Sequence, residues 1–191
     1  MDLVSFTAEK NMLRVQMRRH RRALADAAPE AAEQAARHLP IERFKPFGVV
    51  AGYHPIGAEL DPRPLMRRLA ALGAVVTLPV AVQRDAPLVF RLAGGPRDFV
   101  LDSFGIAGPP PSATEHVPNL VIAPVLAFDR AGGRLGQGAG SYDRTLQALR
   151  AAGAVFVLGL AYCGQEVEGV PGDVHDQRLD AILTENGYRE V

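Results

Sequence analysis

The chain has 191 residues, of which 48% are hydrophobic, and its 21 Lys and Arg residues balance 21 Asp and Glu residues. This length suits one domain spanning residues 1–191, and the neutral balance provides no long-range attraction to nucleic acid or to an anionic membrane. The single cysteine, Cys163, excludes an internal disulfide, no apolar run approaches the roughly 20 residues of a membrane helix, and residues 1–10 lack a secretion-signal pattern. We therefore expect a cytoplasmic protein.

The first half of the chain predicts two helices followed by a strand, a helix and a strand. The first helix contains no Gly or Pro, and Leu13, Met17 and Leu24 recur in it at helical spacing. Gly73 is placed to end the third helix. The expected elements are helices at 7–27 and 29–38, a strand at 47–53, a helix at 62–72 and a strand at 74–80. A unit of this size is typical of two parallel strands joined by a crossover helix.

The second half continues the alternation of apolar strands and helices. The expected elements are strands at 88–92 and 119–123, a helix at 141–152, and strands at 154–160 and 181–184. Polar or Pro-rich loops are expected at 109–117 and 169–178, and a long Gly-rich loop precedes the helix at 141–152. Together these elements predict a doubly wound α/β fold with a mostly parallel sheet.

A glycine-rich segment, residues 129–144, lies between an expected buried strand and an expected helix. Its sequence is DRAGGRLGQGAGSYDR, with glycines at 136, 138 and 140. In open parallel sheets, ligands bind at the carboxyl ends of strands, where helix N-termini offer free N–H donors, and glycine lets the backbone approach an anion closely. The pattern therefore predicts a phosphate-binding loop, with an ordinary flexible loop as the alternative.

The charged residues beside the glycines favour phosphate binding over that alternative. Arg134 could contact phosphate oxygens, and Asp143 could hold Mg²⁺, which prefers carboxylates together with phosphate oxygens. The segment is not a P-loop, because no Lys-Ser/Thr pair follows the last glycine, and it departs from the dinucleotide-binding fingerprint at the third glycine.

The segment resembles the signature loop of the 5-formyltetrahydrofolate cyclo-ligase family. The matching residues are Ala127-Phe128-Asp129 and Arg134-Leu135-Gly136-x-Gly138-x-Gly140-x-Tyr142-Asp143-Arg144. Other family landmarks follow in the expected order, so that the resemblance spans about residues 10–187. These are Lys10-x-x-Leu13-Arg14, Tyr53-x-Pro55, Glu59-Leu60-Asp61, Phe104-Gly105-Ile106 with Pro109, and Asp176 and Asp180 before Leu183-Thr184-Glu185.

The resemblance implies a three-layer, Rossmann-like α/β fold of the cyclo-ligase and sugar-phosphate-isomerase type, with helices on both faces of the sheet. It also implies a monomeric enzyme that uses ATP and Mg²⁺ to convert 5-formyltetrahydrofolate into 5,10-methenyltetrahydrofolate, with release of ADP and phosphate. A formamide oxygen is a poor leaving group, so its phosphorylation would make the formyl carbon electrophilic. Nucleic acid and membranes are not expected as partners.

Residue roles follow from the same resemblance. Lys10 and Arg14, four residues apart on one helical face, would act with Arg134 as catalytic cations on the transferring phosphoryl group. Asp143 and Asp176 would hold the metal. Nucleotide contacts are assigned to Lys10, Arg14, Arg134, Leu135, Gly136, Gln137, Gly138, Ala139, Gly140, Ser141 and Tyr142. Substrate contacts are assigned to His54, Glu59, Gln137, Gly138, Ala139, Gly140, Ser141 and Tyr142.

Several alternatives remain open from the residues alone. Lys10 and Arg14 could belong to a solvated basic helix face, and Glu59 could cap the helix that follows it. A binding protein that holds RNA through the basic residues 18–22 is a different class of function, against which the neutral net charge argues.

Three departures from the family pattern leave open a further alternative, a related enzyme that uses the same ATP-activating chemistry on another small formyl or amide substrate. Ser141 stands where the family usually has a tyrosine, Gly108 stands where it usually has a glutamate, and Leu92 stands where it often has a tryptophan.

Overall fold

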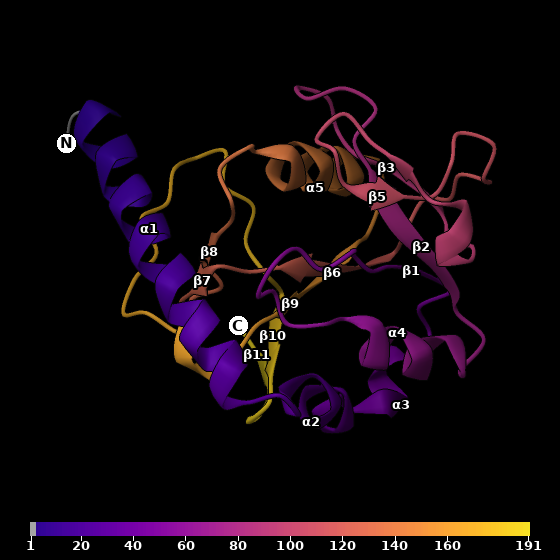
Figure 1. The fold of residues 1–191 in the computed structure, drawn as a ribbon, viewed down its shortest axis with the longest axis horizontal. Helices are drawn as coiled ribbons and strands as arrows, with labels where there is room; N and C mark the ends of the chain where they lie inside the picture. Colours follow the sequence, from indigo (N-terminus) through magenta and orange to yellow (C-terminus); the bar gives the residue numbers. More distant parts are fainter. Residues whose placement is uncertain (1–2) are drawn as a thin grey trace.

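The computed structural model describes residues 3–191, and their centre is a seven-stranded, mostly parallel sheet (Figure 1). Across the sheet the strands are β11 (Gly187–Glu190), β10 (Ala181–Thr184), β9 (Phe156–Leu160), β6 (Leu120–Pro124), β1 (Val49–Ala51), β2 (Val75–Val80) and β3 (Val89–Leu92). The five inner strands run parallel, whereas β11 and β3 close the two edges in antiparallel pairing. The predicted α/β fold is confirmed.

The inner strands are apolar because both faces of the sheet are covered. Val50 of β1 pairs with Val76 of β2 and with Leu120 of β6, and β6 pairs with β9 along its whole length. Every residue of β6 except Pro124 is buried, as is every residue of β9 except Phe156. Continuous apolar runs of this kind, without alternation, are the pattern of parallel strands between two helical layers.

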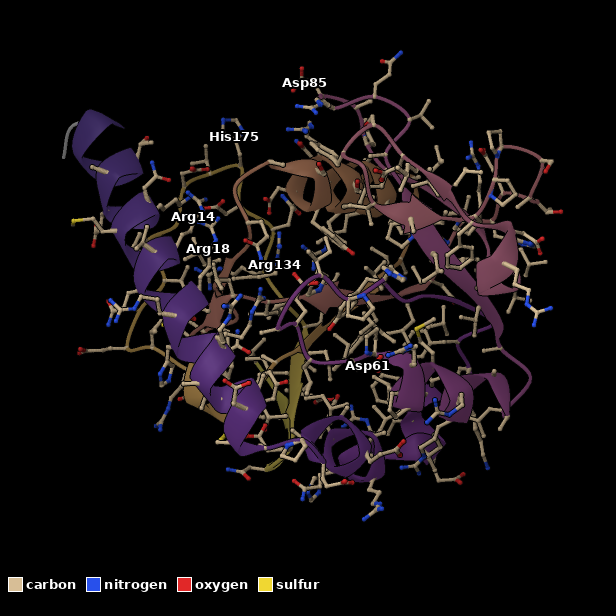
Figure 2. The ribbon with its side chains drawn as sticks, in the orientation of Figure 1. Arg14, Arg18, Asp61, Asp85, Arg134 and His175 are labelled. Carbon is tan, nitrogen blue, oxygen red and sulfur yellow. The ribbon has the colours of Figure 1, made fainter. Side chains whose placement is uncertain are left out.

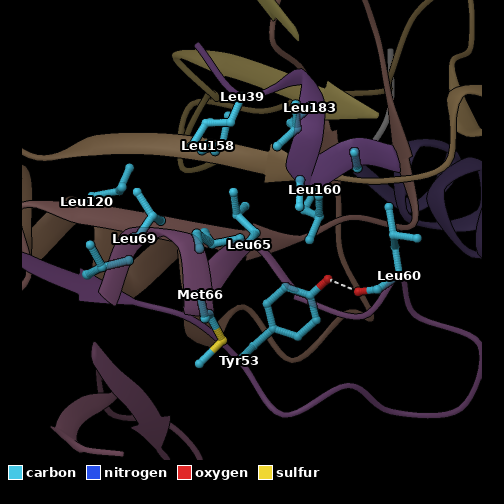
Figure 3. Packing of buried hydrophobic residues seen from close by; sticks show 14 of the residues in the cluster. Leu39, Tyr53, Leu60, Leu65, Met66, Leu69, Leu120, Leu158, Leu160 and Leu183 are labelled. Atoms are coloured by element: carbon cyan, nitrogen blue, oxygen red, sulfur yellow. Dashed lines mark hydrogen bonds between the residues drawn. The ribbon is translucent and has the colours of Figure 1, made fainter. Parts of the chain in front are cut away.

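Helices cover the two faces of the sheet in separate layers (Figure 1). On one face lie α2 (Ala31–His38), α3 (Ile41–Phe44) and α4 (Arg63–Ala70), which contribute Ala35, Phe44 and Leu65 to the larger core cluster (Figure 3). On the other face lies α5 (Ser141–Ala152), which contributes Leu146 to a second cluster with residues of β6 and β9. The three-layer arrangement is therefore present.

The N-terminal helix α1 (Leu3–Ala27) lies outside these layers, beside the sheet (Figure 1). Its Met17 is buried against Leu126, Ala127 and Leu135, and Leu13 packs onto the same cluster. No helix within residues 3–191 combines the length and the apolar character needed to cross a membrane.

The glycine-rich segment is more ordered than the predicted loop. A hairpin of β7 (Ala127–Phe128) and β8 (Arg134–Leu135) forms within it. Asp129 organises the turn, because its Oδ1 accepts hydrogen bonds from the N–H groups of Ala131 and Gly133, at 2.9 and 2.8 Å. Asp129 is thus a turn residue, and the expectation of one continuous loop was wrong.

Other elements were missed or differ in length. The missed ones are α3, β11, the small hairpin of β4 (Val100–Leu101) and β5 (Ala107–Gly108), and the short 3₁₀ turns η1 (Pro96–Asp98) and η2 (Cys163–Gln165). The strand expected at 47–53 is regular only at Val49–Ala51. The helix expected at 141–152 agrees with α5, and Gly73 ends the α4 segment with a φ of 92°.

A fully buried amide side chain, Gln165, joins the ends of two central strands. Its Nε2 donates to the carbonyl oxygens of Val125 and Leu126, both at 2.8 Å, and its Oε1 accepts from the N–H of Tyr162 at 2.9 Å. Because buried polar backbone groups need partners, this side chain stabilises the turns that follow β6 and β9.

We expect Gln165→Ala to lower the free energy of unfolding by about 3 kcal/mol, because three buried backbone groups lose their partner. Urea unfolding followed by circular dichroism measures this change. Gln147→Ala, on an exposed position of α5, is the matched control and should change stability by less than about 0.5 kcal/mol. Equal effects of the two substitutions would contradict the structural role of Gln165.

Candidate active site

A cavity of about 410 Å³ lies at the carboxyl ends of β1, β2 and β6, where open parallel sheets bind ligands. The helix α1 and the segment between β8 and α5 form part of its wall. Figure 2 shows Arg14 and Arg18 on the side of α1 that faces the rest of the molecule, with Arg134 opposite them. The cavity is lined by all the residues that the sequence nominated: Lys10, Arg14, His54, Glu59, Arg134, Leu135, Gly136, Gln137, Gly138, Ala139, Gly140, Ser141, Tyr142, Asp143 and Asp176.

The glycine-rich wall has the backbone geometry of an anion-binding loop. Gly138 has a φ of 109°, and Gly140, the residue before α5, has a φ of 68°. A Cβ atom at Gly138 would lie 3.3 Å from Cζ of Arg14. Gly140 has no side chain with which to cap the N-terminus of the 12-residue helix α5. Its first turn can therefore offer N–H donors and the positive end of the helix dipole to an anion.

Cations of α1 contact this loop directly. Arg14 Nε donates to the carbonyl oxygen of Gly136 at 3.1 Å, and Arg18 donates to the side chain and the carbonyl oxygen of Gln137 at 3.1 and 3.3 Å. Burial and the nearby charge of Arg18 both lower the pKa of Arg14 below its usual value. An anion between them would relieve this repulsion.

Two cation–carboxylate pairs flank the loop. Lys10 Nζ lies 2.6 Å from Asp176 and 3.2 Å from Asp173, and Arg134 Nη2 lies 2.6 Å from Asp143. The Lys10 side chain is only 12% exposed, so a solvated basic face does not describe it. Each pair therefore joins one predicted phosphate ligand to one predicted metal ligand.

The acidic residues do not form a complete metal site by themselves. Among the described residues, no group of three or more His, Cys, Asp or Glu side chains is arranged to hold a metal ion. Asp143 and Asp176 are the two predicted metal ligands that line the cavity, and Mg²⁺ can be held by one or two carboxylates together with water and phosphate oxygens.

At the other end of the polar wall, Glu59 is held by donors from separate segments. Its Oε2 accepts from the N–H of Ile56 at 3.0 Å, and its Oε1 accepts from Nε2 of Gln137 at 3.4 Å and lies 3.5 Å from Nη1 of Arg21. Within residues 3–191, neither Glu59 oxygen accepts a hydrogen bond from the first turn of α4, where the Arg63 N–H donates instead to Oδ1 of Asp61 at 2.9 Å, so Glu59 does not cap that helix.

Two tyrosines lie near this carboxylate. Burial, reinforced by the negative charge of Glu59, raises the pKa of Tyr53 and of Tyr142 above the usual value. Both hydroxyls therefore remain protonated hydrogen-bond donors at neutral pH. The Tyr53 hydroxyl donates to the backbone oxygen of Leu60 (Figure 3), whereas the Tyr142 ring lies 5.7 Å from the Arg134 guanidinium.

The remaining wall is apolar and suits a flat organic ring. It is formed by residues at the end of β2, in the loop before β3, in the loop between β4 and β5, and at the end of β6 with the turn after it: Pro79, Ala81, Leu88, Phe104, Ile106, Pro124, Val125 and Leu126. His54 lies on the exposed rim, with its ring edge-on to Phe99 at 6.2 Å between centroids. Anion-binding groups and an apolar slot thus share one cavity, which suits a phosphorylated ligand beside a planar one.

Sequence reasoning missed Arg21, whose side chain is almost fully buried in the cavity wall. It follows Arg14 by seven residues, which is two helical turns, so it shares the helix face of Lys10 and Arg14. That spacing could have identified it. The apolar wall was harder to find, because it is assembled from four separate segments.

Of the three departures from the family pattern, only Ser141 lies in the cavity wall. Its Oγ is buried and has no hydrogen-bond partner within residues 3–191. Gly108 lies in β5, and Leu92 is exposed at the end of β3, so neither contributes to the lining.

Comparison with known proteins agrees with the sequence resemblance. The sequence profile of the 5-formyltetrahydrofolate cyclo-ligase family matches residues 6–185. A 5-formyltetrahydrofolate cyclo-ligase of Mycolicibacterium smegmatis is 34% identical over 183 residues, covering 92% of this chain and 93% of that protein. One of Escherichia coli K12 is 33% identical over 175 residues, covering 88% and 96%.

Solved structures show the same relationship. The NMR structure of Aquifex aeolicus 5,10-methenyltetrahydrofolate synthetase superposes with a TM-score of 0.78 at 27% identity, covering 95% of this chain and 92% of that one. A 5,10-methenyltetrahydrofolate synthetase from Mycoplasma pneumoniae, at 23% identity and a TM-score of 0.67, shares the fold over 92% of this chain and 98% of its own. From its profile, its relatives and its fold, the chain belongs to the 5-formyltetrahydrofolate cyclo-ligase family of enzymes.

Proposed function

We propose that the chain converts 5-formyltetrahydrofolate into 5,10-methenyltetrahydrofolate in a reaction that depends on ATP and Mg²⁺ and releases ADP and phosphate. One observation supports this most directly. The two cation–carboxylate pairs, the glycine-rich loop and Glu59 line a single cavity, so a triphosphate and a folate could meet there. Proximity of this kind removes much of the entropic barrier to a reaction between two ligands.

The chemistry requires activation of the formyl oxygen. Transfer of the γ-phosphoryl group to that oxygen forms an O–P bond and releases ADP. N10 of the folate then attacks the formyl carbon, the carbon–oxygen bond breaks as phosphate leaves, and the proton of N10 is taken up by the released phosphate. Three cations, Lys10, Arg14 and Arg134, are suited to neutralise the charge on the phosphoryl oxygens while the phosphoryl group passes from ATP to the folate.

The protein side of the metal site would consist of Asp143 and Asp176. A metal ion there would neutralise phosphate charge and align the phosphoryl group for transfer. In the present arrangement both carboxylates neutralise cations, Arg134 and Lys10. If nucleotide and metal bind together, the cations can turn to phosphate and the carboxylates to the metal, so that no buried charge is left without a partner.

The substrate end is assigned to Glu59, the Tyr142 ring, the rim residue His54 and the apolar wall. A carboxylate can accept hydrogen bonds from the amino and N–H groups of a pterin edge. The alternative, a related enzyme acting on another formyl or amide substrate, rests on Ser141, whose unpaired hydroxyl lies where an aromatic ring is usual in the family.

The first test mixes the purified protein with 5-formyltetrahydrofolate, Mg²⁺ and ATP and follows the absorbance of the methenyl-folate product. We expect a rise that is absent without ATP. A folded protein that binds ATP but forms no methenyl-folate would contradict the proposed substrate and favour the alternative.

Lys10→Ala should reduce kcat by about a thousandfold, because a positioned cation facing the phosphoryl group is lost. Lys45 is the other lysine of the chain, and it is exposed and paired with Glu42, so Lys45→Ala is the matched control and should leave kcat unchanged. Steady-state assays and a thermal melt of each variant check this. Near-normal turnover of Lys10→Ala would remove Lys10 from the site.

Calorimetric titration of ATP tests the proposed metal ligands without requiring turnover. We expect Mg²⁺ to strengthen ATP binding by at least about tenfold. The ATP phosphates would draw the cations away from their carboxylates, and the metal ion would then pair with those carboxylates. Asp176→Asn should abolish most of this gain. Asp173→Asn, which also removes a carboxylate from Lys10, should retain the gain. The same result for both substitutions would contradict metal binding at Asp176.

A further inference from the structure

We propose that Arg21 is a positioning residue for folate binding. It holds Glu59 in place at the folate end of the cavity, and Glu59 contacts the folate. This inference rests on the proposed function and adds to it a residue outside the family landmarks seen in the sequence. Arg21 is 6% exposed, lines the cavity, and places Nη1 3.5 Å from Oε1 of Glu59.

The burial of Arg21 is unusual for a charged side chain and needs a physical reason. Its Nε and Nη1 are buried and have no hydrogen-bond partner among the described residues. Its neighbours on α1, Arg19 and Arg22, are both exposed. A buried guanidinium with unpaired donors is costly, and arginine is rarely buried unless it is paired with an opposite charge. Glu59 is the carboxylate that supplies this pairing.

Glu59 in turn needs Arg21. The carboxylate is buried, with a side chain 4% exposed, and its other donors are neutral: the Ile56 N–H and the Gln137 amide. Arg21 is the one cation paired with Glu59 within the part of the chain that the structure describes, so removing it would leave a buried negative charge without that opposite charge, which is strongly unfavourable. Arg21 therefore supplies the opposite charge beside the carboxylate and holds the Oε1 side of Glu59 toward α1.

Arg21 also links the two ends of the cavity. It lies two turns after Arg14 on α1, and Arg14 contacts Gly136 of the glycine-rich loop. Gln137, the next residue of that loop, donates to the same Glu59 oxygen that faces Arg21. The position of the folate-binding carboxylate is thus set by the helix that also supplies the predicted nucleotide cations.

The test is Arg21→Met, with Arg22→Met as the matched control on the same helix. Arg21→Met should weaken binding of 5-formyltetrahydrofolate about tenfold or more, measured as Kd by calorimetry without ATP and as KM during turnover, while KM for ATP stays within about twofold. Arg22→Met should leave all three values unchanged. An equal loss for both ligands would indicate general damage to the site and overturn the proposal.

Two further variants separate positioning from packing. Arg21→Lys keeps a cation near Glu59 and should recover most of the folate affinity lost in Arg21→Met; no recovery would overturn the proposal. In a Glu59→Gln background, Arg21→Met should change folate affinity by less than about twofold, because Arg21 acts through Glu59. Additive losses would show instead that Arg21 contacts the ligand itself.

The outcome is separable from that of the proposed function. If the unmodified protein neither binds 5-formyltetrahydrofolate nor forms methenyl-folate, the proposed function fails. If it does both and Arg21→Met behaves like Arg22→Met, only the role of Arg21 fails. A thermal melt of every variant identifies any that do not fold, and Arg21→Lys, which preserves the charge pair, then provides the decisive comparison.

Discussion

Pairing of buried and half-buried charges is the constraint on which the rest of this site depends. Lys10 with Asp176, Arg134 with Asp143 and Arg21 with Glu59 are three pairs in the wall of one cavity. In each pair the residues come from different elements, and two of the pairs involve α1. A charge removed from water is tolerated only beside an opposite charge, so these pairs fix how α1 approaches the sheet. The same charges are the groups suited to bind phosphate, metal and a polar ring edge.

The sheet and its helices supply the rigid frame for these charges. The carboxyl ends of β1, β2 and β6 lie at one edge of the sheet. The turns that follow these strands place His54, Ala81 and Val125 in the cavity wall. The N-terminus of α5 adds backbone donors at the same place. Because parallel strands all end on the same side, one edge collects polar loops from distant parts of the chain.

Agreement between prediction and structure is closest where local sequence decides the conformation. The helix predicted at 141–152 agrees with α5, and β6 and β9 were predicted because apolar runs suit strands buried between two layers. The hairpin β7–β8 was missed, because Asp129 makes its turn through backbone bonds that no periodicity indicates. Arg21 was passed over as one of several basic residues on an ordinary helix. Its spacing from Lys10 and Arg14 places it on their helix face, but its pairing with Glu59 depends on a segment far along the chain.

The sequence by itself determined the α/β class and the family, because these depend on local patterns and on motifs, and it predicted a phosphate-binding loop at residues 129–144. It also nominated the residues that line the cavity, although their individual roles remain predictions. Only the tertiary structure showed which cation pairs with which carboxylate and that Arg21 is buried against Glu59. It also showed that, of the three departures from the family pattern, Ser141 is the one that lines the cavity. Those facts depend on contacts between segments far apart in the chain. For Arg21 and Glu59, such a contact joins residues 38 positions apart, a distance over which neither helical periodicity nor motif spacing gives any information.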